Sequence, residues 1–185
     1  MMSAMDGKDP CKAHLAMAEL EKMGLQVEVV TQNIDGLHQK AGNTQVVEMH
    51  VTGVNWICKN EKCRHEVPAE NVRGCMAEDG MPRCPKCGKL IRPNIVLYGE
   101  SLDEEKLYDA TCAVGRADTL VVCGTSLTVY PVANLPNNYW GYPVRIVVIN
   151  NQETYLDKTA GLVFREDIGQ VLSDAIEVVK EKQGA

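Results

Sequence analysis

The sequence lacks several features that would assign it to other protein classes. No apolar run approaches the roughly eighteen residues that cross a bilayer, and the N-terminus is polar after Met1 and Met2, without a recognisable signal peptide. Positive charge is not in excess: the formal net charge is −6, which argues against a general nucleic-acid binder. Internal repeats and low-complexity tracts are also missing. We therefore predict a cytoplasmic protein with neither a membrane nor direct nucleic acid as a partner.

What the sequence does contain is an alternation of helix and strand patterns. Helices are expected from Asp9-Pro10 to Gly24 and over about 103–115 and 167–182, and strands at 27–31, 119–123 and 144–149. The last two strands are continuous apolar runs, as in buried parallel sheets. With 185 residues and 45% hydrophobic content, the chain can bury one sizeable core and a small satellite. The fold class expected is therefore α/β, with a Rossmann-like parallel sheet.

Four of the eight cysteines have the spacing of a metal site. They are Cys58, Cys63, Cys84 and Cys87, arranged as C-x4-C, twenty residues, then C-x2-C. This pattern predicts one tetrahedral zinc, and four thiolates leave no coordination position for catalysis, so the metal is structural. The alternatives are two disulfides or four free thiols, and His65 is a competing ligand. We expect a zinc-ribbon insert at 56–91, and the Rossmann-like domain at 1–55 and 92–185.

Polar residues follow three of the expected strands. A cluster that includes Gln32, Asn33 and Asp35 follows the first, Gly124, Thr125 and Ser126 follow the second, and Asn150 and Asn151 follow the third. Ligands collect at the carboxyl ends of parallel strands. Each cluster alone is commonly just a turn or a helix cap. Together, at three strand ends, they suit a nucleotide.

These motifs, in this order, resemble the sirtuins, the family of NAD-dependent protein lysine deacylases. The segments that carry the resemblance are residues 31–38, 47–50, the four cysteines, 92–100, 124–127 with Pro131, Leu135 and Pro136, and Ile149-Asn150. The resemblance runs from about residue 10 almost to the C-terminus. It implies NAD as co-substrate, a structural zinc, and an acylated-lysine protein or peptide as substrate, whose acyl group moves to ADP-ribose while nicotinamide is released.

The resemblance also assigns roles to individual residues. His50 would be the catalytic base, for which an imidazole is suited because its ordinary pKa lies near neutral pH. The cofactor-binding residues would be Gln32 at a ribose, Asn33, Ile34 and Asp35 at nicotinamide, and Gly124, Thr125, Ser126 and Asn150 at the adenosine end. The substrate peptide would pair with a strand made of Val96, Leu97, Tyr98 and Gly99.

Two departures from the family pattern bear on activity. No Gly-rich strand-loop-helix precedes Lys12, so the sheet is expected to be incomplete at the N-terminus and NAD affinity to fall. Val51 stands where the family usually has glycine, and a β-branched residue disfavours positive φ, so the backbone beside His50 is expected to take a different path. The alternatives to an active enzyme are a catalytically inactive acyl-lysine peptide binder and a zinc-ribbon interaction module.

Overall fold

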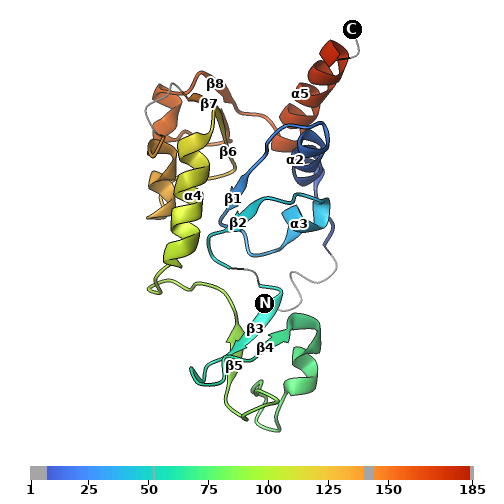
Figure 1. Cartoon of the computed structure of the whole chain (residues 1–185), viewed down its shortest axis with the longest axis vertical. Coiled ribbons are helices and arrows are strands. Elements are labelled where there is room, and N and C mark those ends of the chain that lie inside the picture. The colour runs from blue at the N-terminus through green and yellow to red at the C-terminus, as the bar shows by residue number, and fades with distance from the viewer. Residues whose placement is uncertain (1–7, 52, 140–143, 184–185) are drawn as a thin grey trace. The chain divides into compact units, whose positions relative to one another are not determined.

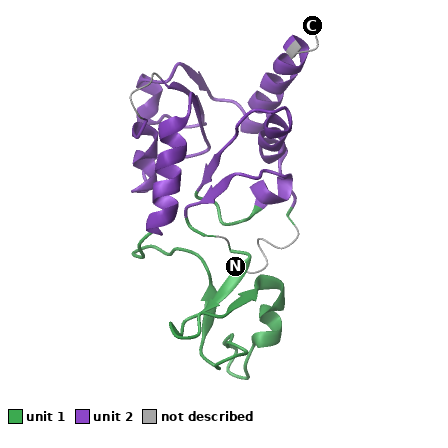
Figure 2. Ribbon diagram, viewed as in Figure 1, with its two compact units in different colours: residues 1–8, 32–36, 50–102 green, residues 9–31, 37–49, 103–185 purple. Residues whose placement is uncertain are grey.

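Two groups of elements, each with its own core, make up the chain (Figures 1 and 2). The structure is a computed structural model that describes residues 8–51, 53–139 and 144–183. The first unit comprises residues 1–8, 32–36 and 50–102, and the second comprises residues 9–31, 37–49 and 103–185. The division predicted from the sequence, with an insert at 56–91, stays a prediction.

The second unit alternates helices with parallel strands. Its elements, in chain order, are α2 (Lys12–Lys22), β1 (Val29–Thr31), α3 (Leu37–Ala41), β2 (Val46–Glu48), α4 (Glu104–Arg116), β6 (Thr119–Cys123), the 3-10 helix η2 (Val132–Asn137), β7 (Arg145–Ile149), the 3-10 helix η3 (Tyr155–Lys158), β8 (Leu162–Phe164) and α5 (Ile168–Gln183). The predicted α/β class with parallel strands is confirmed. Within the described residues the strands form two parallel sheets, β1-β2 and β6-β7-β8, because no ladder joins β1 to β6.

Apolar side chains on both faces of β7 hold this unit together. Ile146 and Val148 pack with Val122 and Leu156 on one side, whereas Ile149 packs with the α2 and α5 pair on the other. Helices α2 and α5 approach closely at Gly169, where a Cβ atom would lie 2.7 Å from the Cβ of Lys12. A larger residue at Gly169 would therefore push the two helices apart.

Helix starts follow capping chemistry, with one error in the prediction. Asp103 begins α4 as expected, because its carboxylate accepts hydrogen bonds from the backbone N–H groups of Glu105 and Lys106. The predicted start of α2 at Asp9-Pro10 is wrong: Cys11 is the N-cap residue, and Asp9 instead forms an ion pair with Lys40. No helix in the described ranges has the length and apolar character to cross a membrane.

The first unit is a small antiparallel sheet with a 3-10 helix. Strand β3 (Asn55–Cys58) lies between β4 (Glu66–Pro68) and β5 (Ile91–Pro93), and the 3-10 helix η1 (Ala69–Cys75) follows β4. Its core consists of two of the predicted metal ligands and three aliphatic side chains: Cys58, Cys84, Val67, Val72 and Ile91. So small a core is typical of a domain that a metal stabilises.

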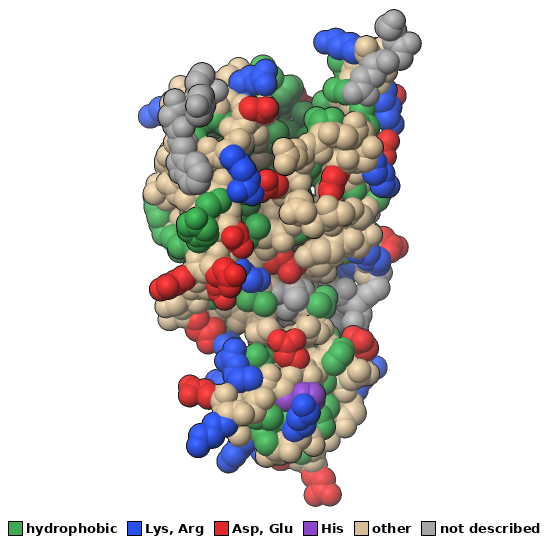
Figure 3. Space-filling model, viewed as in Figure 1, with side chains coloured by type: hydrophobic (Ala, Val, Ile, Leu, Met, Phe, Trp, Pro, Cys, Tyr) green, Lys and Arg blue, Asp and Glu red, His purple; other side chains and the backbone are tan. Residues whose placement is uncertain are grey.

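On the face drawn in Figure 3, acidic and basic side chains are interspersed, in keeping with the modest net charge of −6.

Candidate active site and metal centre

The four predicted metal ligands converge in the first unit. The sulfur atoms of Cys58, Cys63, Cys84 and Cys87 all lie within 4.8 Å of one another. The Cys58–Cys87 and Cys63–Cys84 sulfur distances are 3.4 and 3.8 Å, and a zinc tetrahedron with Zn–S bonds of about 2.3 Å has edges of about 3.8 Å. All four cysteines are free, so the disulfide alternative is wrong. The donor set and its dimensions fit one zinc ion, and His65 is not part of the cluster.

The surroundings of the cluster already favour thiolates at some positions. Burial raises the pKa of Cys58 to about 12, whereas the backbone N–H of Lys89 leads the interactions that lower the pKa of Cys87 to about 6. The backbone and side-chain N–H groups of Asn60 also point at the sulfurs of Cys58 and Cys87, at 3.4 and 3.8 Å. Such donors stabilise the negative charge that four zinc-bound thiolates carry.

The predicted active-site residues fall into two groups, one in each unit. The group in the first unit is centred on His50, which is half-buried. Its Nδ1 lies 3.0 Å from the backbone carbonyl oxygen of Gln32. A carbonyl oxygen only accepts, so Nδ1 donates the proton and the neutral ring keeps a lone pair on Nε2. The structure thereby selects the tautomer in which Nε2 can accept a proton.

Backbone hydrogen bonds tie three predicted segments together around this histidine. The N–H of Gly53 donates to the carbonyl of Ile34 at 2.8 Å, and the N–H of Val96 donates to the carbonyl of His50 at 3.0 Å. Residues 32–35, His50 and the start of the predicted substrate segment are therefore neighbours within one unit. Asn33 is exposed and Asp35 is half-buried.

Val51 lies in the left-handed region, with φ of 60°. The expectation that a β-branched residue here would avoid positive φ is wrong. The hydrogen bonds of His50 and Gly53 on either side of Val51 hold the turn in this conformation despite its cost. The neighbour of the predicted base is thus a strained residue.

The predicted substrate-binding segment differs in its local structure from the prediction. Strand β5 ends at Pro93, and residues 97–100 form a turn closed by a hydrogen bond from Glu100 N to the Leu97 carbonyl. The reason is local: the Glu100 carboxylate accepts from Leu97 N at 3.0 Å and pairs with Arg92, which bends the chain after Val96. These donors, led by the Leu97 N–H, hold the pKa of Glu100 below its ordinary value. Tyr98 is 97% exposed, so it lines no cavity within its own unit.

The group in the second unit lines a pocket at the carboxyl ends of β6, β7 and β8. The pocket has a volume of about 420 Å³ and is lined by Gly124, Thr125, Ser126, Asn150, Asn151, Gln152, Glu166, Asp167 and Ile168. Residues 124–126 and Asn150, which were predicted to bind one ligand, therefore meet at one pocket. This is the edge of the sheet at which α/β proteins bind ligands.

Local geometry explains why Gly124 begins the first wall of the pocket. Its φ is +58°, and a Cβ atom would lie 3.1 Å from the Ile168 side chain. Thr125 accepts a hydrogen bond from the Leu127 N–H, and the hydroxyls of Ser126 and Thr128 lie 2.7 Å apart. Burial raises the pKa of Cys123, just before Gly124, to about 11, so this thiol stays neutral. The wall therefore offers hydroxyls and backbone rather than a nucleophile.

Four lining residues were missed from the sequence: Gln152, Glu166, Asp167 and Ile168. The last three follow β8, a three-residue strand that the apolar pattern did not reveal. Asp167 accepts a hydrogen bond from Gln170 N at the start of α5. A capping aspartate directly after an unrecognised strand was the available signal.

Comparisons with known proteins agree with one another. The sequence model of the Sir2 family matches residues 1–131. An NAD-dependent protein deacetylase of Thermodesulfovibrio yellowstonii is 39% identical over 94% of this chain and 68% of its own length. An NAD-dependent protein deacetylase of Clostridium perfringens is 41% identical over 91% of this chain and 66% of its own length. The chain thus spans about two thirds of the length of these curated relatives.

Solved structures show the same relationship. A structure of Sir2 with a p53 peptide and NAD+ has a TM-score of 0.86 and 35% identity, covering 96% of this chain and 73% of the other. A structure of Sir2Tm bound to a propionylated peptide has a TM-score of 0.88 and 36% identity, covering 96% of this chain and 74% of the other. Similarity at this level extends to the fold of nearly the whole chain.

Proposed function

The chain belongs to the Sir2 family, and from this premise we propose that it is an NAD-dependent protein lysine deacylase. The reaction transfers the acyl group of a lysine to ADP-ribose and releases nicotinamide. The curated relatives are NAD-dependent protein deacetylases and deacylases, and solved relatives hold acetylated and propionylated peptides. The observation that carries the proposal for this chain is the tautomer of His50, set by the carbonyl of Gln32.

His50 has the role of general base. Nicotinamide leaves as the acyl oxygen of the substrate bonds to the ribose carbon. With Nδ1 committed to the Gln32 carbonyl, Nε2 then accepts the proton of a ribose hydroxyl, which attacks the acyl carbon, and the bond from that carbon to the lysine nitrogen breaks. The hydrogen bond to Gln32 also stabilises the imidazolium that forms, because its Nδ1–H remains the donor. Asn33, Ile34 and Asp35, on the same segment as Gln32, hold the nicotinamide group.

The pocket in the second unit receives the adenosine end of NAD. Its hydroxyl, amide and carboxylate side chains match the hydrogen-bonding groups of a ribose, which both donates and accepts. Gly124 allows the backbone to approach the ligand because it has no side chain, and its left-handed φ disfavours any other residue at this position. NAD itself supplies the electrophilic ribose carbon, whereas these residues only bind and orient.

The zinc ion has a structural role in this scheme. Cys58, Cys63, Cys84 and Cys87 would hold it, and their four thiolates fill its coordination shell. The acylated substrate contacts the segment Val96, Leu97, Tyr98 and Gly99, which joins the His50 segment through the Val96 N–H. Free cysteines suit a reducing compartment, so we place the protein in the cytoplasm.

The test follows nicotinamide release and the deacylated peptide in an assay with NAD and an acetylated peptide. The wild-type chain should form both, and His50→Ala should lower the rate of peptide deacylation at least a hundredfold, the usual contribution of a general base. His14→Ala is the matched control, because His14 lies in the second unit and contacts Cys11. Peptide binding without nicotinamide release at millimolar NAD would contradict the enzymatic role and favour an acyl-lysine binding protein.

A further inference from the structure

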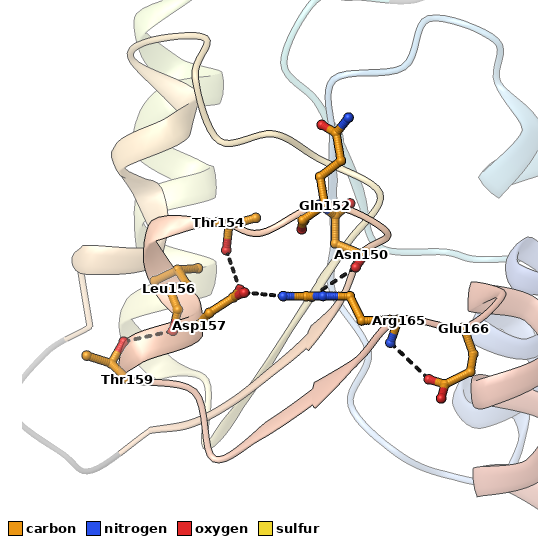
Figure 4. Close-up of polar contacts among 8 residues, drawn as sticks. All are labelled: Asn150, Gln152, Thr154, Leu156, Asp157, Thr159, Arg165 and Glu166. Carbon is orange, nitrogen blue, oxygen red and sulfur yellow. Dashed lines mark hydrogen bonds and ion pairs between the residues drawn. The ribbon is translucent and has the colours of Figure 1, made fainter.

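Arg165 follows strand β8 and joins two neighbouring segments of the second unit (Figure 4). One guanidinium nitrogen donates to the backbone carbonyl of Asn150 at 2.9 Å, and another forms an ion pair with Asp157. The guanidinium therefore spans the end of β7 and the 3-10 helix η3. The planar guanidinium makes these two contacts with two different nitrogens held in a fixed fork.

Asp157 is itself held in place. Thr154 donates its hydroxyl to the other carboxylate oxygen at 2.9 Å. Burial raises the pKa of Asp157, but the hydrogen bonds from Thr154 and Arg165 outweigh it, so the pKa lies below its ordinary value. The side chains of Arg165 and Asp157 are 35% and 19% exposed, which makes this pair more shielded than an ordinary surface ion pair.

The contact with Asn150 reaches the pocket through a short chain of hydrogen bonds. Asn150 donates its side-chain amide to the Gln152 carbonyl at 2.8 Å and its backbone N–H to the Phe164 carbonyl at 3.1 Å. Asn150 and Gln152 line the pocket, whereas Arg165 is not among the lining residues. The side chain of Arg165 is therefore connected to the pocket by hydrogen bonds through the loop 150–152.

We propose that Arg165 is a positioning residue for the nucleotide pocket: by bridging Asp157 and the Asn150 carbonyl, it fixes the loop 150–152 in the geometry that receives the adenosine end of NAD. The inference rests on the proposed function, since it concerns the same pocket. Preorganisation of this loop lowers the cost of ordering it when the nucleotide binds. The guanidinium acts on affinity and takes no part in acyl transfer.

The ordinary alternative is an ion pair that only stabilises the fold. Such a pair would change the melting temperature and leave nucleotide affinity in the folded protein unchanged. A positioning residue instead changes the dissociation constant of the ligand and the KM for NAD at constant kcat. The two roles therefore differ in a measurement made on folded protein.

The experiment is a calorimetric titration of ADP-ribose into the wild type, Arg165→Gln, Arg165→Lys and Asp157→Asn. Arg165→Gln should weaken binding roughly tenfold, the usual effect of losing a charged hydrogen bond. Arg165→Lys should fall between Arg165→Gln and the wild type, because an ammonium group keeps the charge but lacks the fixed fork of donors. Asp157→Asn should weaken binding about threefold, since the Asn150 contact survives. Arg116→Gln, which breaks an ion pair with Glu28 elsewhere in the unit, should bind like the wild type.

The KM for NAD should rise by the same factors while kcat at saturating NAD stays within about twofold of the wild type. Should Arg165→Gln fail to fold, the Lys and Asn variants decide the matter. Binding within twofold of the wild type in all folded variants would overturn the inference alone. Failure of the wild type to bind ADP-ribose would overturn the proposed function together with this inference.

Discussion

Val51, next to the proposed base, offers the sharpest test of the backbone geometry. Its φ is 60°, so glycine at this position should give a more stable protein than alanine, which reverses the usual order of the two residues. Replacement by alanine or glycine removes the branched side chain in both cases, so the comparison between the two variants isolates the Cβ atom at positive φ. We predict that Val51→Gly is more stable than Val51→Ala.

The size of the difference follows from two opposing effects. A residue with a Cβ atom pays about 1–2 kcal/mol in the left-handed region, which glycine avoids. Glycine loses about 0.4–1 kcal/mol through the greater freedom of its unfolded chain. With mid-range values for both effects, the net advantage of Val51→Gly is about 0.8 kcal/mol, or a melting temperature about 2–3 °C higher for a chain of this size.

Thermal unfolding followed by circular dichroism measures the difference. A matched pair at Val178, an exposed residue within α5, should show the reverse order, since alanine is favoured over glycine by about 1 kcal/mol in a helix. If Val51→Ala proved as stable as Val51→Gly or more so, the positive φ at Val51 would be refuted. There would then be no strain at Val51 for the hydrogen bonds of His50 and Gly53 to offset.

Three further predictions concern the metal, the substrate turn and the cofactor. Metal analysis should find one zinc per chain, and the zinc content should fall in Cys87→Ser. Chelation should unfold the β3-β4-β5 sheet, which tryptophan fluorescence would report, and leave the helical circular dichroism signal of α2 and α5 unchanged. Glu100→Gln should raise the KM for acylated peptide several-fold at constant kcat, because only the carboxylate binds both the Leu97 N–H and Arg92. The wild-type KM for this peptide should be independent of pH above the ordinary pKa of 4.5. It should rise as the pH falls through the depressed pKa of Glu100. NADP should bind at least about tenfold more weakly than NAD, because the carboxylates of Glu166 and Asp167 repel a 2′-phosphate. Replacing both residues by their amides should reduce the difference between the two affinities, as competition titrations would measure.

The sequence was most informative where one local rule decides the structure. Helix α4 covers almost the predicted range of 103–115, the apolar runs at 119–123 and 144–149 are parallel strands, and the cysteine spacing leads to a compact cluster. The start of α2 was misjudged: Cys11 is the N-cap residue, and Asp9 pairs with Lys40, thirty-one residues away, a contact that no local pattern reveals.

The pocket was predictable only on one side. Residues 124–126 and Asn150 follow strands with clear apolar patterns, whereas Glu166 and Asp167 follow β8, whose three residues are too few for a pattern. The conformation of Val51 depends on hydrogen bonds between segments far apart in sequence, so residue types alone do not reveal it. The turn after Val96 instead rests on contacts of Glu100 with Leu97 and Arg92, which are close in sequence.

One consequence of the cysteine cluster concerns residues that the metal does not touch. Residues His50 and Val96 stand on the two chain segments that enter and leave the zinc unit, and the pairing of β3 with β5 sets the spacing between those segments. A zinc ion at the four cysteines would close the loop of chain between these two segments, which carry the proposed base and the proposed peptide-binding residues. Zinc occupancy should consequently control the turnover rate, although the ion does not touch the reacting groups. A reagent that removes the exposed Cys87 thiolate from the metal would increase the mobility of both segments together.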